Sequence, residues 1–174
     1  MLYLFRLIVA RYGFDWLDAL LQQDVQWVRG ATLATGTIIE NHANNGSRVL
    51  TFSGLGGFTP STDFLKVKQP VSPDQFMTWA QQAAIFKSTR RPESAKLLAS
   101  FLLSDEWQGP IAARGVPSIR ASLNTAQGTD VFAANNTQPS GYINFMSDRE
   151  GVEWWRFQME LSIGLARGDD PTGN

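Results

Sequence analysis

The pattern of apolar and polar positions predicts helices at both ends of this chain. Over residues 2–12, apolar side chains recur at helical spacing, and Gly13 is expected to end that helix. A second helix is predicted over 14–23, because its tryptophan and leucines share one face. A long amphipathic helix is expected over 144–164. Its apolar face consists of Phe145, Met146, Val152, Trp155, Met159 and Ile163.

The segment after the second helix changes to a strand, helix and strand pattern. Alternating residues predict short strands over 25–29 and 48–52. The stretch 30–46 between them is predicted as a helix, with Thr32 as its N-cap and Gly46 as its stop. Two strands joined by a helix favour a parallel pair with a right-handed crossover. We therefore expect an α/β fold, a mixed sheet flanked by helices.

Shorter elements are predicted in the middle of the chain. Residues 64–68 are expected to form a short strand, and residues 79–87 bring back an apolar segment. A helix should follow a cap at Ser88 or Thr89, since alanine and leucine then repeat at helical spacing, with Pro92 near its first turn. The remaining expectations are a short helix over 105–115, an extended segment over 116–123 and a polar surface connection over 121–141.

Composition places these elements in one globular domain. The chain has 174 residues, 43% of them hydrophobic, and a net charge of −1, which fits a single domain over 1–168 and a flexible tail over 169–174. A nearly neutral chain without a basic patch is not expected to bind nucleic acid. Arg6 and Arg11 interrupt the N-terminal apolar run, so we expect no membrane insertion and no convincing signal peptide here.

The residues available for chemistry argue against catalysis. The chain has no cysteine and a single histidine, His42, at a polar helix end where a surface position is expected. Thiolate sites and multi-histidine zinc sites are therefore excluded. Charged residues near 150 are interpreted as first-turn helix charges rather than an acid–base pair. We expect no enzyme activity, no catalytic residue, no metal site and no cofactor.

A glycine-rich stretch over 51–61 follows the second predicted strand. Gly54 and Gly56 match the start of a dinucleotide fingerprint, but Thr59 takes the third glycine's place and Pro60 prevents a helix from opening there. A phosphate cradle is thus not predicted. We interpret the stretch as a strand end at the edge of a cleft, with plain turn residues as the alternative.

The most specific stretch is 83–108, "AAIFKSTRRPESAKLLASFLLSDEWQ". It combines an apolar segment, a basic turn, a Pro-Glu step and a helix ending in Phe-Leu-Leu-Ser. In this it resembles the C-terminal signature of extracellular solute-binding proteins of ABC-type transporters, which have the type II periplasmic-binding-protein fold. Residues 27–30 and 148–164 look similar to fungal members described as iron(III)-transporter-like. The resemblance extends over residues 2–168.

The resemblance implies a function and a location. It implies a non-catalytic protein that holds a small-molecule solute in a cleft between two lobes, secreted or periplasmic-like in its full-length form. Family members have two lobes and are longer than this chain, so we expect an incomplete two-lobe protein that supplies mainly the second lobe. Its partner would be the N-terminal lobe or a second copy. The alternative is a secreted structural or interaction protein that kept the fold but lost ligand binding.

The resemblance and the predicted strand ends together place the ligand site. In open α/β sheets ligands bind beyond the carboxyl ends of strands, where free helix N–H groups hold anions. Arg29 is expected to pair with a carboxylate, or else to form a strand-end salt bridge, and Trp79 to stack on a ligand, or else to lie in the core. The candidate ligand-binding residues are Arg29, Gly30, Thr32, Ser53, Gly54, Trp79 and Gln81.

Iron-binding members of this family use adjacent tyrosines near the glycine-rich stretch. This chain has Phe52, Phe58 and Phe64 in that region, and its three tyrosines lie elsewhere. A ferric site is therefore not implied.

Overall fold

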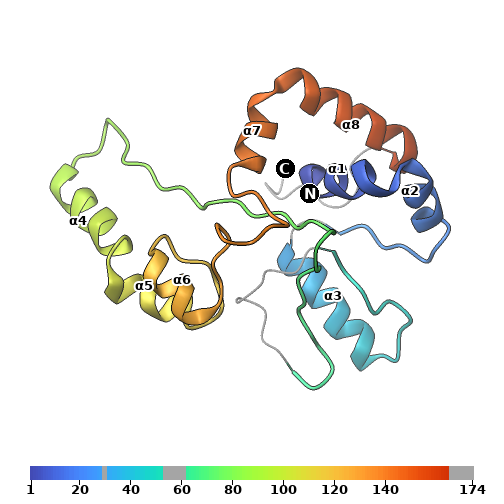
Figure 1. The fold of residues 1–174 in the computed structure, drawn as a ribbon, viewed down its shortest axis with the longest axis horizontal. Coiled ribbons are helices and arrows are strands. Elements are labelled where there is room, and N and C mark those ends of the chain that lie inside the picture. Colours follow the sequence, from blue (N-terminus) through green and yellow to red (C-terminus); the bar gives the residue numbers. More distant parts are fainter. Residues whose placement is uncertain (29–30, 53–61, 165–174) are drawn as a thin grey trace.

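The computed structural model describes residues 1–28, 31–52 and 62–164, and these ranges contain eight α-helices and no strand. Figure 1 labels the helices in chain order. They are α1 (Leu2–Tyr12), α2 (Phe14–Leu21), α3 (Ala31–Ala43), α4 (Pro92–Leu102), α5 (Asp105–Ala112), α6 (Ala121–Gln127), α7 (Gly141–Ser147) and α8 (Arg149–Ile163).

The expected α/β fold with a mixed sheet is wrong for this part of the chain. Residues 25–28, 48–52 and 64–68, predicted as strands, form irregular connections, as do residues 84–87, where the family resemblance implies a strand. Two parallel strands need hydrogen bonds between the backbone N–H and C=O groups of one strand and those of the other. Here a side chain joins the two segments instead. The Arg48 guanidinium donates to Asp24 Oδ1 at 2.6 Å and to Asp24 O at 3.1 Å. Thus α3 connects two irregular segments rather than two strands.

The two predicted N-terminal helices are confirmed as α1 and α2. Gly13 separates them at φ 77°, a backbone conformation that side chains other than glycine rarely adopt. Its N–H donates to Val9 O at 2.8 Å and closes the last turn of α1. The chain therefore turns sharply at Gly13, and α2 packs back against α1.

The helix predicted over 144–164 is two helices that meet at Asp148. Asp148 has non-helical backbone angles, and its Oδ1 accepts a hydrogen bond of 3.0 Å from the N–H of Gly151. An aspartate in this position is a preferred N-cap, so α8 begins anew there. The predicted apolar face is confirmed, because Phe145, Val152 and Met159 are buried.

Four helices, α1, α2, α7 and α8, form what we call the terminal bundle (Figure 1). Its core has two clusters around the buried residues Tyr3, Phe145 and Val152, and Val9, Leu17 and Met159. Trp155 packs against both clusters, as predicted, and its ring stacks on Phe14. Trp154 and Phe157 of the same helix are exposed.

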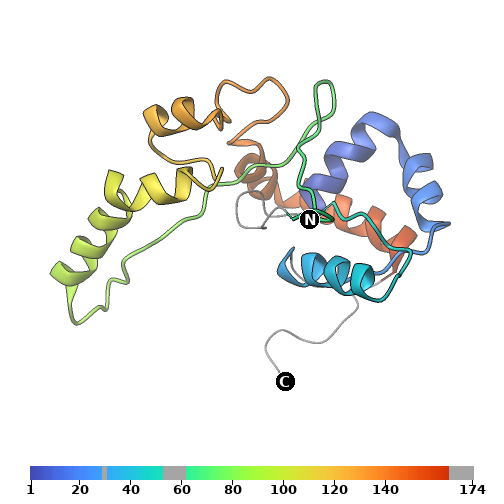
Figure 2. The same ribbon diagram turned by 90° about the horizontal axis from the view of Figure 1, so that it is seen from below.

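Helices α4, α5 and α6 form a second unit, the distal group, which stands apart from the terminal bundle in both views (Figures 1 and 2). The predicted helices at Pro92 and Asp105 are confirmed as α4 and α5. Neither Ser88 nor Thr89 caps α4, whose N-cap is Arg91. Helix α6 was not predicted, since its residues fell in segments expected to be extended or irregular.

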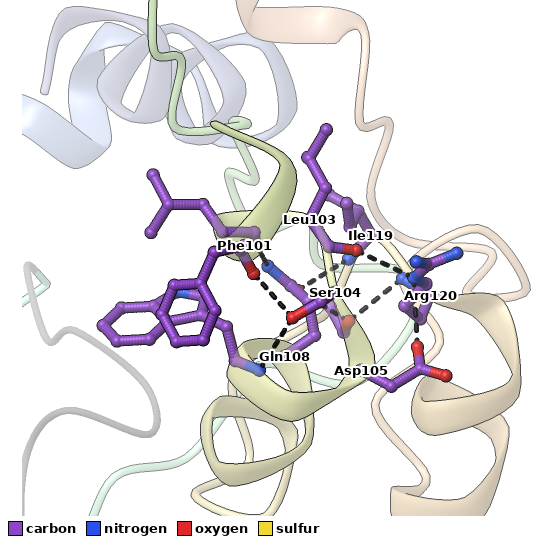
Figure 3. Close-up of polar contacts among 10 residues, drawn as sticks. Phe101, Leu103, Ser104, Asp105, Gln108, Ile119 and Arg120 are labelled. Carbon is purple, nitrogen blue, oxygen red and sulfur yellow. Dashed lines mark hydrogen bonds and ion pairs between the residues drawn. The ribbon is translucent and has the colours of Figure 1, made fainter. Parts of the chain in front are cut away.

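Side-chain hydrogen bonds hold the distal group together (Figure 3). The Gln108 amide donates to Leu102 O at 2.7 Å and accepts from the Ser118 hydroxyl at 2.8 Å. Arg120 reaches Leu103 O at 3.0 Å and Asp105 at 3.1 Å. These contacts fix α5 against α4 and the start of α6.

Candidate ligand-binding site

Two connections link the terminal bundle to the distal group, residues 66–91 and 128–140, and they run together at a place we call the crossing. The crossing comprises residues 74–78 and 136–138. The side-chain amide of buried Asn136 donates to the carbonyl oxygens of Pro70 and Asp74, both at 2.9 Å. The N–H of Phe76 donates back to Asn136 O at 3.2 Å.

Threonine hydroxyls complete the crossing. The buried Thr137 hydroxyl donates to Phe76 O at 2.8 Å and lies 3.0 Å from the Thr78 hydroxyl. Buried polar groups are stable when they are hydrogen-bonded in this way. These hydrogen bonds therefore hold the two connections together and fix which of their residues lie opposite each other.

Helix α1 anchors the crossing to the terminal bundle. Arg11 Nε and the Tyr12 hydroxyl both donate to Asp74 Oδ1, at 2.8 Å and 2.5 Å. The Tyr12 hydrogen bond, followed by that of Arg11, holds the pKa of the Asp74 carboxyl below its usual value. Asp74 is thus ionised at neutral pH and already has two donors.

A small pocket lies between α1 and the crossing. Tyr3, Arg6, Leu7 and Ala10 line it from one face of α1, since positions separated by three and four residues share a helix face. Gln75, Phe76, Thr137 and Gln138 line it from the crossing. The cavity has a volume of about 220 Å³.

Arg6 is the charged residue of this pocket. Its half-buried side chain places the guanidinium carbon 5.8 Å from the ring centre of Tyr3 and 5.5 Å from that of Phe145. Within the described ranges, no carboxylate forms an ion pair with Arg6, and no acidic residue lines the pocket. The pocket therefore has one positive charge.

An aromatic row leads from the pocket to Trp79. The Tyr3 and Tyr142 rings lie edge to face at 6.2 Å between centroids, and the Trp79 and Tyr142 centroids are also 6.2 Å apart. Trp79 is 42% exposed. The row therefore has Tyr3, which lines the pocket, at one end and the solvent-exposed ring of Trp79 at the other.

Trp79 and Gln81 are the predicted ligand-binding residues that the structure describes fully. Both are exposed and lie on the connection 66–91. The alternative prediction, that Trp79 lies in the core, is therefore wrong. Thr32 is in the first turn of α3, one residue after its start, instead of at the predicted N-cap. Arg29, Gly30, Ser53 and Gly54, and the Thr32 side chain, lie outside the described residues.

Sequence reasoning missed Arg6, Gln75 and Gln138. A signal for Arg6 was present, because this charged residue falls between Tyr3 and Ala10 on the face of α1 that turns toward protein. The crossing residues had no comparable signal, since hydrogen bonds between segments about sixty positions apart leave no periodicity.

A second hollow of about 300 Å³ lies at the end of α3. The His42 ring stacks on Phe64 with centroids 4.1 Å apart, and His42 is exposed in the last turn of α3, as predicted. Arg48 also lines this hollow but is paired with Asp24. The charge of this hollow is therefore balanced, unlike that of the pocket at Arg6.

The described residues include no group of three or more His, Asp or Glu side chains that could hold a metal ion. No described helix has the length and apolar character needed to cross a membrane. Comparison with known protein families finds none that matches this chain, and comparison with curated proteins finds no relative.

Proposed function

We propose that this chain is a non-catalytic solute-binding protein that holds a small molecule in the pocket between α1 and the crossing. The observation that carries the proposal is that Arg6 and the amides of Gln75 and Gln138, which have no partner among the described side chains, meet an exposed aromatic row at one small cavity. Pockets in which a few polar groups converge beside apolar side chains are typical ligand sites.

The position of the pocket supports the proposal. It lies where two connections leave the terminal bundle for the distal group, and each unit has its own internal contacts. Binding proteins commonly close two units around a ligand by bending a few connecting residues. In this protein Trp79 and Gln81 are on the connection just beyond the crossing, where closure would bring them toward the solute.

The sequence resemblance to solute-binding proteins of ABC transporters supports the same class of function. On this proposal the protein is secreted or periplasmic-like and delivers a small solute to a transporter. A further lobe or a second copy of the chain would cover the open side of the site.

Calorimetric titration tests this function. The panel comprises ferric ion, a polyamine, a thiamine-like cation and small carboxylates. We expect one class to bind, and a ligand at 100 times its Kd should stabilise the fold by about 2.7 kcal/mol in thermal unfolding. Trp79→Ala should weaken that binding, whereas Trp154→Ala, at an exposed position on α8, should not. If the chain binds no member of the panel, the proposal is wrong.

One observation favours a second candidate, an interaction protein that forms homodimers. No residue of α4 is buried, and Leu97, Leu98 and Phe101 leave apolar surface on this helix exposed. A second copy offers a matching apolar surface through two-fold symmetry. Light scattering should then show a dimer that becomes a monomer in Leu97→Glu. A wild-type monomer at all concentrations would exclude this candidate.

A further inference from the structure

We propose that the solute is a small carboxylate, bound by the guanidinium of Arg6. This inference rests on the proposed function, because it names the chemical class of ligand for the same pocket. The charge, the size and the wall of the pocket support it.

The charge of the pocket favours an anion. Arg6 is half-buried and lacks an acidic partner in the described part of the chain. The carboxylate of the crossing, Asp74, already accepts from Arg11 and Tyr12 through one of its oxygens. A guanidinium presents paired N–H groups that match the two oxygens of a carboxylate.

The aromatic contacts of Arg6 position its charge without neutralising it. The rings of Tyr3 and Phe145 attract the cation through their π faces, but they have no negative charge and accept no strong N–H hydrogen bond. The guanidinium therefore keeps donors for a ligand while its orientation is restricted by two rings.

The size and wall of the pocket define the rest of the solute. About 220 Å³ is below the roughly 300–1,000 Å³ of sites for drug-sized ligands. Leu7, Ala10 and Phe76 offer apolar surface to a short carbon chain. The side-chain amides of Gln75 and Gln138 have no hydrogen bond to a described residue, so they can donate to a carboxylate oxygen or a hydroxyl.

A monocarboxylate matches this site better than phosphate does. Phosphate carries more than one negative charge at neutral pH and would meet a single cation among the described lining residues. A short carboxylate matches that single charge and also uses the apolar wall. The expected ligand is thus a short-chain or hydroxylated monocarboxylate.

The test is calorimetric titration of the whole chain with sodium propionate and sodium lactate. Propionamide serves as the uncharged isostere of propionate, and inorganic phosphate as the competing anion. We expect both carboxylates to bind at least about tenfold more tightly than propionamide and phosphate, and to bind more weakly as salt increases. Equal binding of propionate and propionamide would overturn the inference.

Variants assign the binding to Arg6. Arg6→Gln should weaken propionate binding at least about tenfold, and Arg6→Lys should weaken it less, because lysine keeps the charge but not the paired donors. Arg114→Gln is the matched control, since this exposed arginine of the distal group lines no part of the pocket and changes net charge equally. Unchanged binding in Arg6→Gln would refute the assignment.

A further variant leaves Arg6 itself intact. Gln138 is exposed on the crossing and lines the pocket, so Gln138→Glu should place a carboxylate near Arg6 and prevent propionate binding without unfolding the protein. Gln138→Ala should weaken propionate binding less than Gln138→Glu does, because it removes one donor but adds no negative charge. Propionate binding that survives Gln138→Glu would count against the site.

The outcomes separate this inference from the proposed function. If a cation or neutral solute of the larger panel binds and the carboxylates do not, the protein remains a solute-binding protein and the carboxylate inference is wrong. If no solute binds, both are wrong.

Discussion

The Tyr12 hydroxyl donates a 2.5 Å hydrogen bond to Asp74 Oδ1 and so joins the end of α1 to the crossing. This contact, shared with Arg11, connects a helix of the terminal bundle to a segment more than sixty residues later. The pocket at Arg6 depends on it, because it sets the distance between the two walls of the cavity.

The first prediction concerns pH. The pKa of Asp74 is lower in the folded protein than in the unfolded chain, so its contribution to stability is present above the unfolded value of about 3.9 and is lost as pH falls through the folded value. The melting temperature should therefore fall below about pH 4. Asp74→Asn should reduce this dependence on pH, and Asp63→Asn, at an exposed position, should not. An unchanged acid limb in Asp74→Asn would contradict the prediction.

The second prediction concerns the amide of Asn136. Asn136→Asp keeps the shape of the side chain but removes the donor shared by Pro70 O and Asp74 O. We expect a loss of about 1–3 kcal/mol in the free energy of unfolding, since a buried group is left unsatisfied. Urea unfolding measures it, with Asn135→Asp at the exposed neighbour as control. Equal stability of the two variants would show that the crossing does not depend on this amide.

A third prediction contrasts two leucines. Leu17 is 0% exposed in the terminal bundle, whereas Leu97 on α4 is 73% exposed. Leu17→Ala should cost about 2–5 kcal/mol by leaving a cavity, and Leu97→Ala less than about 0.5 kcal/mol. Chemical denaturation of both variants checks the placement of the core. A large loss for Leu97→Ala would mean that α4 is covered in solution.

The fourth prediction concerns the distal group alone. The buried Asn124 amide donates to Ser118 O at 2.7 Å and accepts from Ser118 N–H at 2.6 Å. Asn124→Ala should increase hydrogen exchange in α5 and α6 and leave α1 and α8 protected, because stability is local to each unit. Asn144→Ala on α7 is the control. Faster exchange throughout the chain would show that the two units unfold together.

Sequence periodicity predicted the helices well and the sheet wrongly. The residues around Leu17 and Met159 repeat at helical spacing over two turns or more, so their burial could be inferred. Short apolar runs such as 48–52 are ambiguous, because alternation over five residues does not determine whether a partner strand exists. Here Val49 and Leu50 are exposed, and the side chain of Arg48 binds Asp24.

The sequence indicated Trp79 and Gln81 as ligand-binding residues, but neither lines the pocket, and it did not indicate Arg6, Gln75 or Gln138. The signals at Trp79 are its aromatic ring and its polar neighbours, which are local properties of the sequence. Arg6 acquires its role only when residues 74–78 lie against α1, and that contact depends on Asn136 and Asp74, far apart in the sequence.

The crossing also has a topological consequence. The chain leaves the terminal bundle at Thr78 and returns at Asn136, and in the described part of the chain no hydrogen bond, ion pair or ring contact joins residues 80–135 to the four helices of the bundle. The distal group is thus an insertion, because the chain enters it and leaves it at the same place, the crossing. Natural or engineered chains could exchange this module for another, or replace it with a short linker, and keep the pocket at Arg6 intact.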